Sequence, residues 1–582
     1  MTLLDWLLVV GLNAPIVLYA LWRGRGVKTS GEWFLANRSL PWWVIGLSMY
    51  ATMIDSSDMV VDAGGAYQFG VRMFVVNWVG VVAGWLLMAH VVALPMYRAG
   101  MYTNAEYLEA RFGPAARVIS VFVQLQFRTM VLGIMANTIF LTLTIVLELS
   151  EPAAWTTVVL IALLATLYTM SGGLKAVAVT DAMQSVVMVL ASIAIFVLVY
   201  QSVGGWTGLE TALASIDRPD AATVLHTGQD YVEMIDAKDM AEEQIIRHEQ
   251  LGAEYVALYQ SIVKHTAPWL ASLSLVLTGM AYSIVNHTQS MRMFGARSEW
   301  DFKMSAVLAS GVVLVVTFLN LSVGVIGRAI YPDLASLPVA DGLRSVDAVF
   351  PVLVRDLAVS GLRGVIVAGI MAASFSTFDS IGSTMSALLT RDVYARLLVT
   401  DADDRHYLMV GRWLTPVIIF GSFAYLPLLN AGMFAFYMQM VAVFVTPLLT
   451  VYLMGTLTRV HRRAGTIGLM VGVAYGLWGL LSQYVFFETG RLLMPAALMN
   501  SSAAAPMSVL VTATAMFAVT LLLGPVEAGD SIHEEPTGWL RNSQHATRAL
   551  ASTPPSRLDA LPLVLGVLAL ISGLCLSFIV FY

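Results

Sequence analysis

Charged side chains are scarce in this chain of 582 residues, of which only 12% are Asp, Glu, Lys or Arg. Soluble proteins carry about 25% charged residues, whereas 58% of this sequence is hydrophobic. These proportions exclude a soluble globular protein and predict a polytopic membrane protein. The net charge of −6 indicates little about partners other than the lipid bilayer, because the charges lie mainly between apolar runs.

Cysteine is also nearly absent, since Cys575 is the only one. A disulfide within the chain is therefore excluded, and no group of Cys and His has the spacing of a zinc site. Basic residues interleaved with aromatics are lacking, which argues against nucleic-acid binding. We find no nucleophile–base pairing and no polar segment long enough for a catalytic domain, so the sequence does not predict an enzyme. Nothing in it indicates an obligate protein partner.

Apolar runs of about 20 residues recur along the whole chain, each long enough to cross a bilayer. We count about 14 of them by hydropathy. They centre near Val10, Tyr50, Val82, Val131, Leu160, Leu190, Leu275, Val315, Gly369, Ile418, Val443, Val473, Ala515 and Leu570. The first run lacks a preceding basic stretch and a cleavage site, so we expect a retained helix and not a signal peptide.

Lys and Arg gather in alternate loops, as the positive-inside rule requires of a multi-pass protein. The pattern predicts a plasma membrane protein of the bacterial inner-membrane type with both termini outside. One of the loops expected inside holds Arg292, Arg297 and Lys303. We also expect two long loops, an outer one at 202–265 and an inner one at 526–558.

Two apolar runs are interrupted by polar residues near their middle. Residues 55–58 (Asp-Ser-Ser-Asp) interrupt the run near Tyr50, and residues 286–289 (Asn-His-Thr-Gln) interrupt the run near Ser283. A transmembrane helix broken in this way frees backbone carbonyls and typically lines a transporter's binding site. If the first run is an accessory helix, the broken runs begin two halves of five helices each, as in an inverted repeat.

We therefore expect a single transmembrane domain over residues 1–582. Its predicted parts are an accessory helix with a loop (1–40), a first five-helix repeat (41–201), the outer loop (202–265), a second five-helix repeat (266–457) and C-terminal accessory helices (458–582).

Hydroxyls and carboxylates also lie inside two other apolar runs. Residues 171–184 include Asp181, and residues 376–380 read Ser-Thr-Phe-Asp-Ser. Hard oxygen ligands of this kind suit alkali cations better than soft metals. A carboxylate at membrane depth is costly and usually faces a cavity or an ion path. The two stretches together predict an ion-coupled transporter.

Four motifs resemble those of the sodium:solute symporter family, which includes sodium-coupled glucose, proline, pantothenate, iodide and sialic acid transporters. They lie at residues 37–54, 103–112, 171–184 and 376–394. The chain departs from the pattern at Val179, where many members have tryptophan. The resemblance implies an all-α, five-plus-five inverted-repeat (LeuT-like) fold with flanking helices, and sodium as the coupling ion.

The resemblance further implies a sodium site where the broken first core helix meets the eighth. The implied ligands are the backbone carbonyls of Ala51, Ile54 and Ala373 and the hydroxyls of Ser376 and Thr377. An unwound helix frees carbonyls, and the two hydroxyls add neutral oxygens. The alternative is that both hydroxyls only bond back to the carbonyl four residues earlier.

Some members have a second cation site, which would fall here on Asp181, Asp379 and Ser380, beside Ser376. Asp379 stands where those members have serine. Two carboxylates would bind a cation more strongly, or one of them could hold a proton. The alternative is a structural hydrogen-bond network around Asp379.

By the same resemblance, the solute would lie at the midplane between the two broken helices. The implied lining residues are Asp55, Asp58, Asn77, Arg128, Tyr282 and Gln439. Arg128 matches an arginine that holds the substrate carboxylate in sialic acid transporters, a geometry that suits a planar guanidinium. The alternative is an internal ion pair between Arg128 and Asp55 or Asp58. Asp62 is expected nearer the outer mouth.

These patterns predict a secondary active symporter that couples inward sodium flow to uptake of a small polar organic solute by alternating access. A zwitterionic or carboxylate-bearing solute would satisfy both the acidic residues and Arg128. Two alternatives stay open. One is a proton-coupled carrier of the same fold, with Asp181 and Asp379 relaying protons, and the other is a membrane sensor that binds the solute without transporting it.

Overall fold

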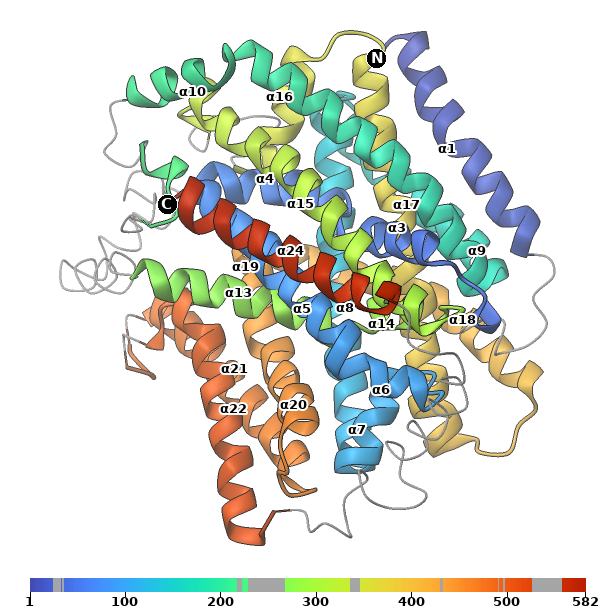
Figure 1. The fold of residues 1–582 in the computed structure, drawn as a ribbon. Coiled ribbons are helices and arrows are strands. Elements are labelled where there is room, and N and C mark those ends of the chain that lie inside the picture. Colours follow the sequence, from blue (N-terminus) through green and yellow to red (C-terminus); the bar gives the residue numbers. More distant parts are fainter. Residues whose placement is uncertain are drawn as a thin grey trace.

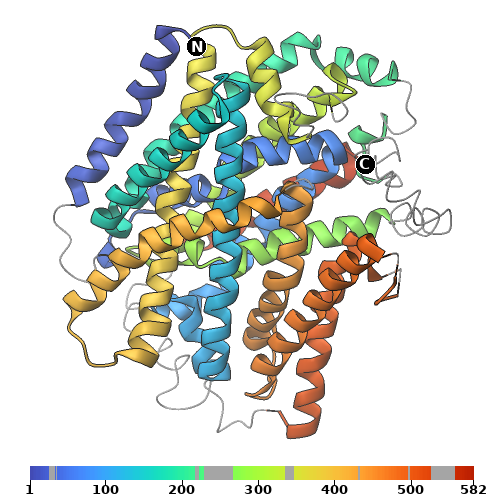
Figure 2. The same cartoon turned by 180° about the vertical axis from the view of Figure 1, so that it is seen from behind.

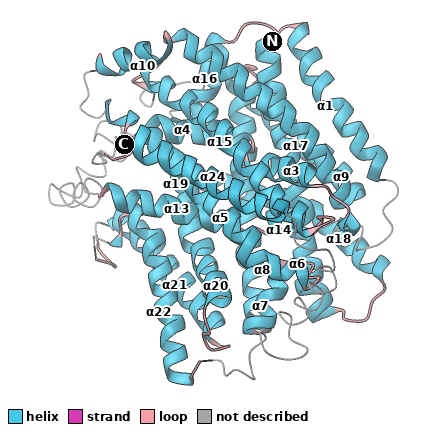
Figure 3. Cartoon of the chain, viewed as in Figure 1, coloured by secondary structure: helices cyan, strands magenta, loops and turns pink. Residues whose placement is uncertain are grey.

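The computed structural model describes residues 1–24, 33, 36–216, 222–228, 267–334, 346–429, 433–489, 491–495, 498–525 and 557–582. Within these ranges the chain is helical and forms no β-strand (Figure 3). Thirteen helices there are long and apolar enough to cross a membrane. They coincide with thirteen of the predicted runs, and the remaining run, near Tyr50, is divided between two shorter helices. The predicted all-α membrane fold is confirmed.

The first half of the chain forms a bundle that α1 flanks on one side, packed against α9 and α17 (Figure 1). Its helices and helical turns are α1 (Leu3–Gly24), α3 (Trp42–Met53), α4 (Ser56–Phe69), η3 (Val76–Val81), α5 (Val82–Leu87), η4 (Met88–Val92), α6 (Ala93–Arg98), α7 (Asn104–Phe112), α8 (Pro114–Ile145), α9 (Glu151–Ser202) and α10 (Gly205–Ala214). The helix α9 bends at Gly173, whose φ of +63° favours glycine. A Cβ there would also lie 2.7 Å from Trp33.

The second half repeats the pattern of a broken helix followed by long spans. Its helices and helical turns are α13 (Pro268–Val285), α14 (His287–Phe294), α15 (Glu299–Ile330), α16 (Val349–Leu357), α17 (Leu362–Leu388), η8 (Leu389–Leu398), α18 (Asp404–Gly421), η9 (Ser422–Leu428), α19 (Met433–Met440), η10 (Val441–Val445), α20 (Thr446–Leu457), α21 (Ala464–Thr489), α22 (Ser501–Leu523), α24 (Leu561–Cys575) and η13 (Leu576–Val580).

Both predicted helix breaks are present, and each is made by the polar residue at the break. Asp55 caps α4, because its side chain accepts the backbone N–H groups of Ser57 and Asp58, while the Asp58 side chain accepts the N–H of Asp55. Asn286 caps α14 in the same way by accepting the N–H of Thr288. A cap starts a new helix, so each apolar run becomes two helices with a non-helical residue between them.

The helix α17 forms the centre of the bundle, and most of its residues are buried. It packs against α1, α8, α9 and α18 and passes the break between α3 and α4. Seen from behind, α8 runs the height of the molecule beside α17 (Figure 2). The centre of the protein is thus the place where α17 meets the first broken helix.

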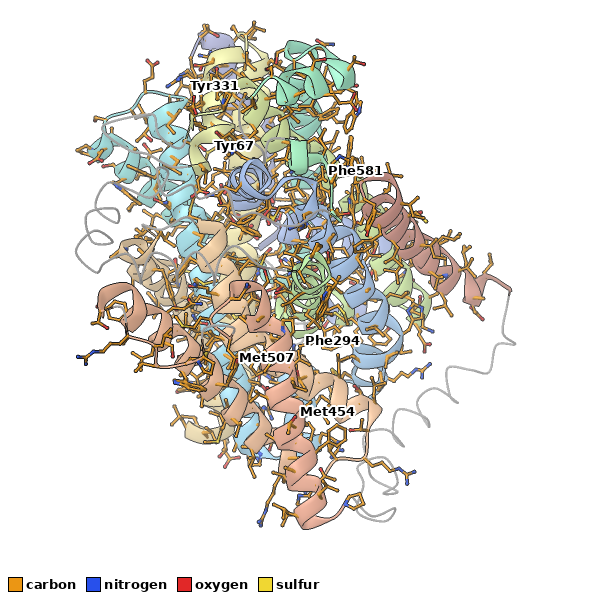
Figure 4. All side chains as sticks on the ribbon, turned by 90° about the vertical axis from the view of Figure 1, so that its left-hand side faces the viewer. Tyr67, Phe294, Tyr331, Met454, Met507 and Phe581 are labelled. Carbon is orange, nitrogen blue, oxygen red and sulfur yellow. The ribbon has the colours of Figure 1, made fainter. Side chains whose placement is uncertain are left out.

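The far end of α4 is tied to the end of α15. The Tyr67 hydroxyl donates to the carbonyl oxygens of Tyr331 at 2.7 Å and Pro332 at 2.9 Å, which share its single proton. Figure 4 labels Tyr67 and Tyr331. Most of the predicted outer loop and nearly all of the predicted inner loop lie outside the described residues, although α10 falls within the outer loop. The boundaries of the two repeats and the outward orientation of both termini stay predictions.

Candidate cation and solute sites

The predicted sodium ligands meet where α3 ends and α17 passes. The hydroxyl of Ser376 lies 3.0 Å from the carbonyl oxygen of Ala51, so the two helices touch at this point. Ile54 has left the helical conformation, with φ −90° and ψ 98°. On α17, Ala373 and Thr377 are four residues apart, and Ser376 shares their face. The structure therefore brings Ser376 into contact with Ala51, and the other three predicted residues lie within four positions of this contact along the two chain segments.

The Thr377 hydroxyl is buried and has no hydrogen-bond partner in the part of the chain that the structure describes. Ser376 contacts Ala51 and Asp181. Among the described contacts, neither hydroxyl bonds back to the carbonyl four residues earlier, which was the alternative left open by the sequence. A buried polar group without a partner costs about 1–3 kcal/mol. A cation held by these oxygens would remove that cost, so the residues present fit sodium.

A second polar cluster adjoins this junction and is centred on Asp181 of α9. Its carboxylate accepts hydrogen bonds from Ser48 and Ser376, each at 2.6 Å. It also forms an ion pair with Arg292 Nη2 at 2.9 Å. Ser376 thus belongs to both clusters.

The placement of Arg292 corrects one prediction. Arg292 lies in α14 and not in a loop, and none of its side chain is exposed. All three of its nitrogens donate: Nε to Ser48 at 2.7 Å, Nη1 to the Thr288 carbonyl at 2.7 Å, and Nη2 to Asp181 and Ser380. The sequence places Arg292 near Arg297 and Lys303, which made it look like a loop residue. Its charge is tolerated at depth because Asp181 balances it.

The carboxylate of Asp379 faces the same cluster. Tyr168 donates to its Oδ2 at 2.9 Å, and Ser380 donates to its Oδ1 at 3.0 Å. These contacts form the hydrogen-bond network that the sequence left open as the alternative to a cation site. The second cation site at Asp181, Asp379 and Ser380 stays a prediction.

Two adjoining cavities lie between α4, α13 and α19. Their shared lining residues are Met53, Asp58, Asp62, Tyr282, Phe434 and Tyr437. Asn77 lines only the first cavity, and Asp55 lines only the second. Of the predicted solute residues, the structure therefore brings Asp55, Asp58, Asn77 and Tyr282 together.

One expectation about this site is corrected. Gln439 lies in a separate cavity beside α21, where it donates to Gln483 at 2.7 Å. Tyr437 faces the central cavities instead, and residues two apart on a helix point in roughly opposite directions. Asp62 lines both central cavities, because it follows Asp58 by four residues and so shares its face. Its place nearer the outer mouth stays a prediction.

Arg128 on α8 stands next to Tyr282, a lining residue of both cavities. Only 1% of Arg128 is exposed. Its Nη1 makes a long contact of 3.5 Å with the Tyr282 hydroxyl, and its Cζ lies 5.7 Å from the centre of that ring. In the described ranges its Nε and Nη2 have no hydrogen-bond partner, and no carboxylate lies within 4.0 Å of it. The internal ion pair considered above is therefore not formed.

This architecture, with two broken helices around a polar centre inside an apolar bundle, defines an ion-coupled membrane transporter. The chain belongs to the sodium:solute symporter family, whose family model matches residues 33–476. The predicted family, and with it the class of sodium-coupled symporters, is confirmed.

Individual relatives agree with this assignment. The chain is 28% identical over 479 residues to sodium/glucose cotransporter 4 of Danio rerio, covering 79% of this chain and 68% of the relative. It is 28% identical over 521 residues to sodium/glucose cotransporter 2 of Rattus norvegicus, covering 84% and 72%. A solved substrate-bound, outward-open Na+-coupled sialic acid symporter, described as revealing a novel Na+ site, superposes with a TM-score of 0.68 at 19% identity. That superposition covers 90% of this chain and 98% of the other. The superposition confirms the LeuT-like fold.

Proposed function

We propose that this chain imports a small polar organic solute together with sodium across the plasma membrane by alternating access. The observation that carries the proposal is the break between α3 and α4. The proposed sodium ligands at and opposite the break are Ala51, Ile54, Ala373, Ser376 and Thr377. Met53 and Asp55, at the same break, line the cavities proposed for the solute. Sodium would therefore fix the backbone that shapes the solute site.

The energy available is sufficient for accumulation. A sodium ion that crosses the membrane down its potential supplies about 2.3 kcal/mol per 100 mV. A second cation at Asp181, Asp379 and Ser380 would roughly double that contribution. Because Arg292 already balances Asp181, Asp379 is the carboxylate left to carry a second sodium or a proton.

The proposed solute site is formed by Asp55, Asp58, Asn77 and Tyr282, with Arg128 behind Tyr282. The relatives whose names refer to glucose and to sialic acid support a small organic solute. The unpaired N–H groups of Arg128 support acceptor oxygens on the solute, since a guanidinium binds a carboxylate through two parallel hydrogen bonds.

The test begins with the thermal stability of the purified protein in sodium chloride and in potassium chloride at equal ionic strength. A ligand that binds the folded state raises its stability by mass action, so sodium should raise the melting temperature. A solute found by the same assay is then supplied to proteoliposomes, where it should stimulate uptake of labelled sodium. A solute that binds, but that is not taken up and does not stimulate sodium uptake, would indicate a sensor. Uptake driven by a pH gradient without sodium would indicate a proton-coupled carrier.

A further inference from the structure

The central cavities are acidic and aromatic. Three carboxylates (Asp55, Asp58 and Asp62) and three rings (Tyr282, Phe434 and Tyr437) contribute to the two linings, together with methionines. Among the described residues that line either cavity, none is Lys, Arg or His. The electrostatics at the solute position therefore favour a positive charge.

The three carboxylates are not equivalent. Asp55 and Asp58 are engaged in the reciprocal cap at the start of α4, where each accepts a backbone N–H of the other's residue. Asp62 lies one turn further on the same face and has no hydrogen bond or ion pair to any residue that the structure describes. Of the three carboxylates, that of Asp62 is therefore the one available to bind a ligand.

The local charges do not cancel. Arg128 is a cation next to Tyr282, whereas three carboxylates from α4 contribute to the cavity linings. An excess of negative charge at membrane depth is costly unless a cation offsets it. Aromatic ring faces attract organic cations, and polarizable methionines pack around them. Sodium prefers a shell of small oxygen ligands, whereas this lining consists largely of rings and methionine side chains.

We propose that the solute carries a cationic amine and that Asp62 recognises it, with the ammonium group held against the rings of Tyr282, Phe434 and Tyr437. This inference rests on the proposed function, because it assigns a chemical class to the solute of that cavity. Asp62 is a specificity-determining residue in this scheme. Asp55 and Asp58 keep α4 in place.

The experiment measures thermal stability of the purified full-length protein, in sodium chloride and in potassium chloride, with four probes: ethanolamine, β-alanine, glucose and lactate. The two amines should raise the melting temperature, and glucose and lactate should not. Asp62→Asn removes the charged partner of a charge-assisted hydrogen bond, so it should weaken amine binding by roughly ten-fold or more. Asp62→Glu keeps the charge and should retain the preference for amines.

The matched control is Asp356→Asn on α16. Arg355 donates to Asp356 and holds the pKa of that carboxyl below its usual value, so the substitution removes one full negative charge outside the cavities. Amine binding should be unchanged in this variant. Asp62→Asn is nearly isosteric and breaks no described contact. Should it fail to purify, Phe434→Leu removes one ring and should weaken amine binding roughly threefold.

The inference is overturned if glucose or lactate stabilises the protein and the amines do not, if neither amine has an effect, or if Asp62→Asn binds amines as tightly as the parent. Failure of the proposed function is a separate result. Amine binding that depends on Asp62 but is equal in sodium and in potassium would refute sodium coupling and leave the assignment of Asp62 intact.

Discussion

Two arginines are buried in the centre of this protein, and they differ in how fully they are paired. Arg292 donates from all three nitrogens and is in contact with the carboxylate of Asp181. Arg128 has two nitrogens without a partner among the described residues and no carboxylate within 4.0 Å. Both are at most 1% exposed.

The difference distinguishes an arginine that holds helices together from an arginine that can bind a ligand. A buried guanidinium whose three nitrogens all donate joins helices, and here it ties α14 to α3, α9 and α17. A buried guanidinium with free donors retains an unmet hydrogen-bonding capacity, which a ligand with acceptor oxygens can meet. The comparison therefore predicts that a substitution at Arg292 lowers the stability of the protein, whereas a substitution at Arg128 weakens solute binding.

The largest effect is expected from Arg292→Gln. The change leaves Asp181 buried without its ionic partner, which should lower the free energy of unfolding by about 3–5 kcal/mol. The measurement is thermal stability of the purified protein. Arg128→Gln is the matched control and should change stability little. An additional Asp181→Asn should partly rescue Arg292→Gln, and equal melting temperatures for Arg292→Gln and the parent would contradict a structural role.

The second-largest effect is expected on the sodium concentration that uptake requires. Ser376→Ala with Thr377→Ala removes two proposed ligands at about 1 kcal/mol each, so half-maximal uptake should need at least about ten-fold more sodium. The assay is sodium-dependent uptake in proteoliposomes. Ser374→Ala is the control, because that hydroxyl bonds back to the Ile370 carbonyl on the same helix. Unchanged sodium dependence in the double variant would remove these residues from the site.

Arg128→Lys tests whether Arg128 takes part in solute binding. Lysine keeps the charge but loses the planar fork, so binding of a solute with a carboxylate or similar acceptor should weaken by about ten-fold, with unchanged stability. The measurement is solute affinity by thermal shift. Gln439→Ala, in the separate cavity, should leave affinity unaltered. Wild-type affinity in Arg128→Lys would place Arg128 outside solute recognition.

The smallest change is expected from Asp379→Asn. If Asp379 carries a second sodium, the substitution should reduce the charge moved per cycle from two towards one with a neutral solute. If it carries a proton, uptake should depend on pH, and the variant should flatten that profile. The measurement is the reversal potential against the sodium gradient at two pH values. A stoichiometry of one sodium, indifferent to pH and to Asp379→Asn, would show that the contacts with Tyr168 and Ser380 are only structural.

The broken helices could be predicted from the sequence because their cause is local. Asp55 and Asn286 stand inside apolar runs, and such residues cap helices through their own side chains. Arg292 could not be placed in this way, because its partner Asp181 is 111 residues away along the chain. The available signal was Asp181 itself, since a carboxylate inside a span needs a positive partner.

The solute site was predictable in part from the family resemblance. That resemblance implied Asp58 and Tyr282 as lining residues, and both lie close to the two breaks. Gln439 lies on a helix whose cavity-facing side is set by tertiary packing, and the sequence does not give that rotation. The spacing of Asp62 from Asp58 already indicates that both residues share one face of α4.

The hydroxyl of Ser376 has a single proton and two acceptors, the carbonyl of Ala51 at 3.0 Å and the carboxylate of Asp181 at 2.6 Å. A sodium ion that took the Ala51 carbonyl and the Ser376 oxygen as ligands would turn the proton fully towards Asp181. The arrival of the ion would then strengthen the link between α17 and α9. By thermodynamic reciprocity, the factor by which sodium strengthens the bond from Ser376 to Asp181 equals the factor by which that bond strengthens the binding of sodium.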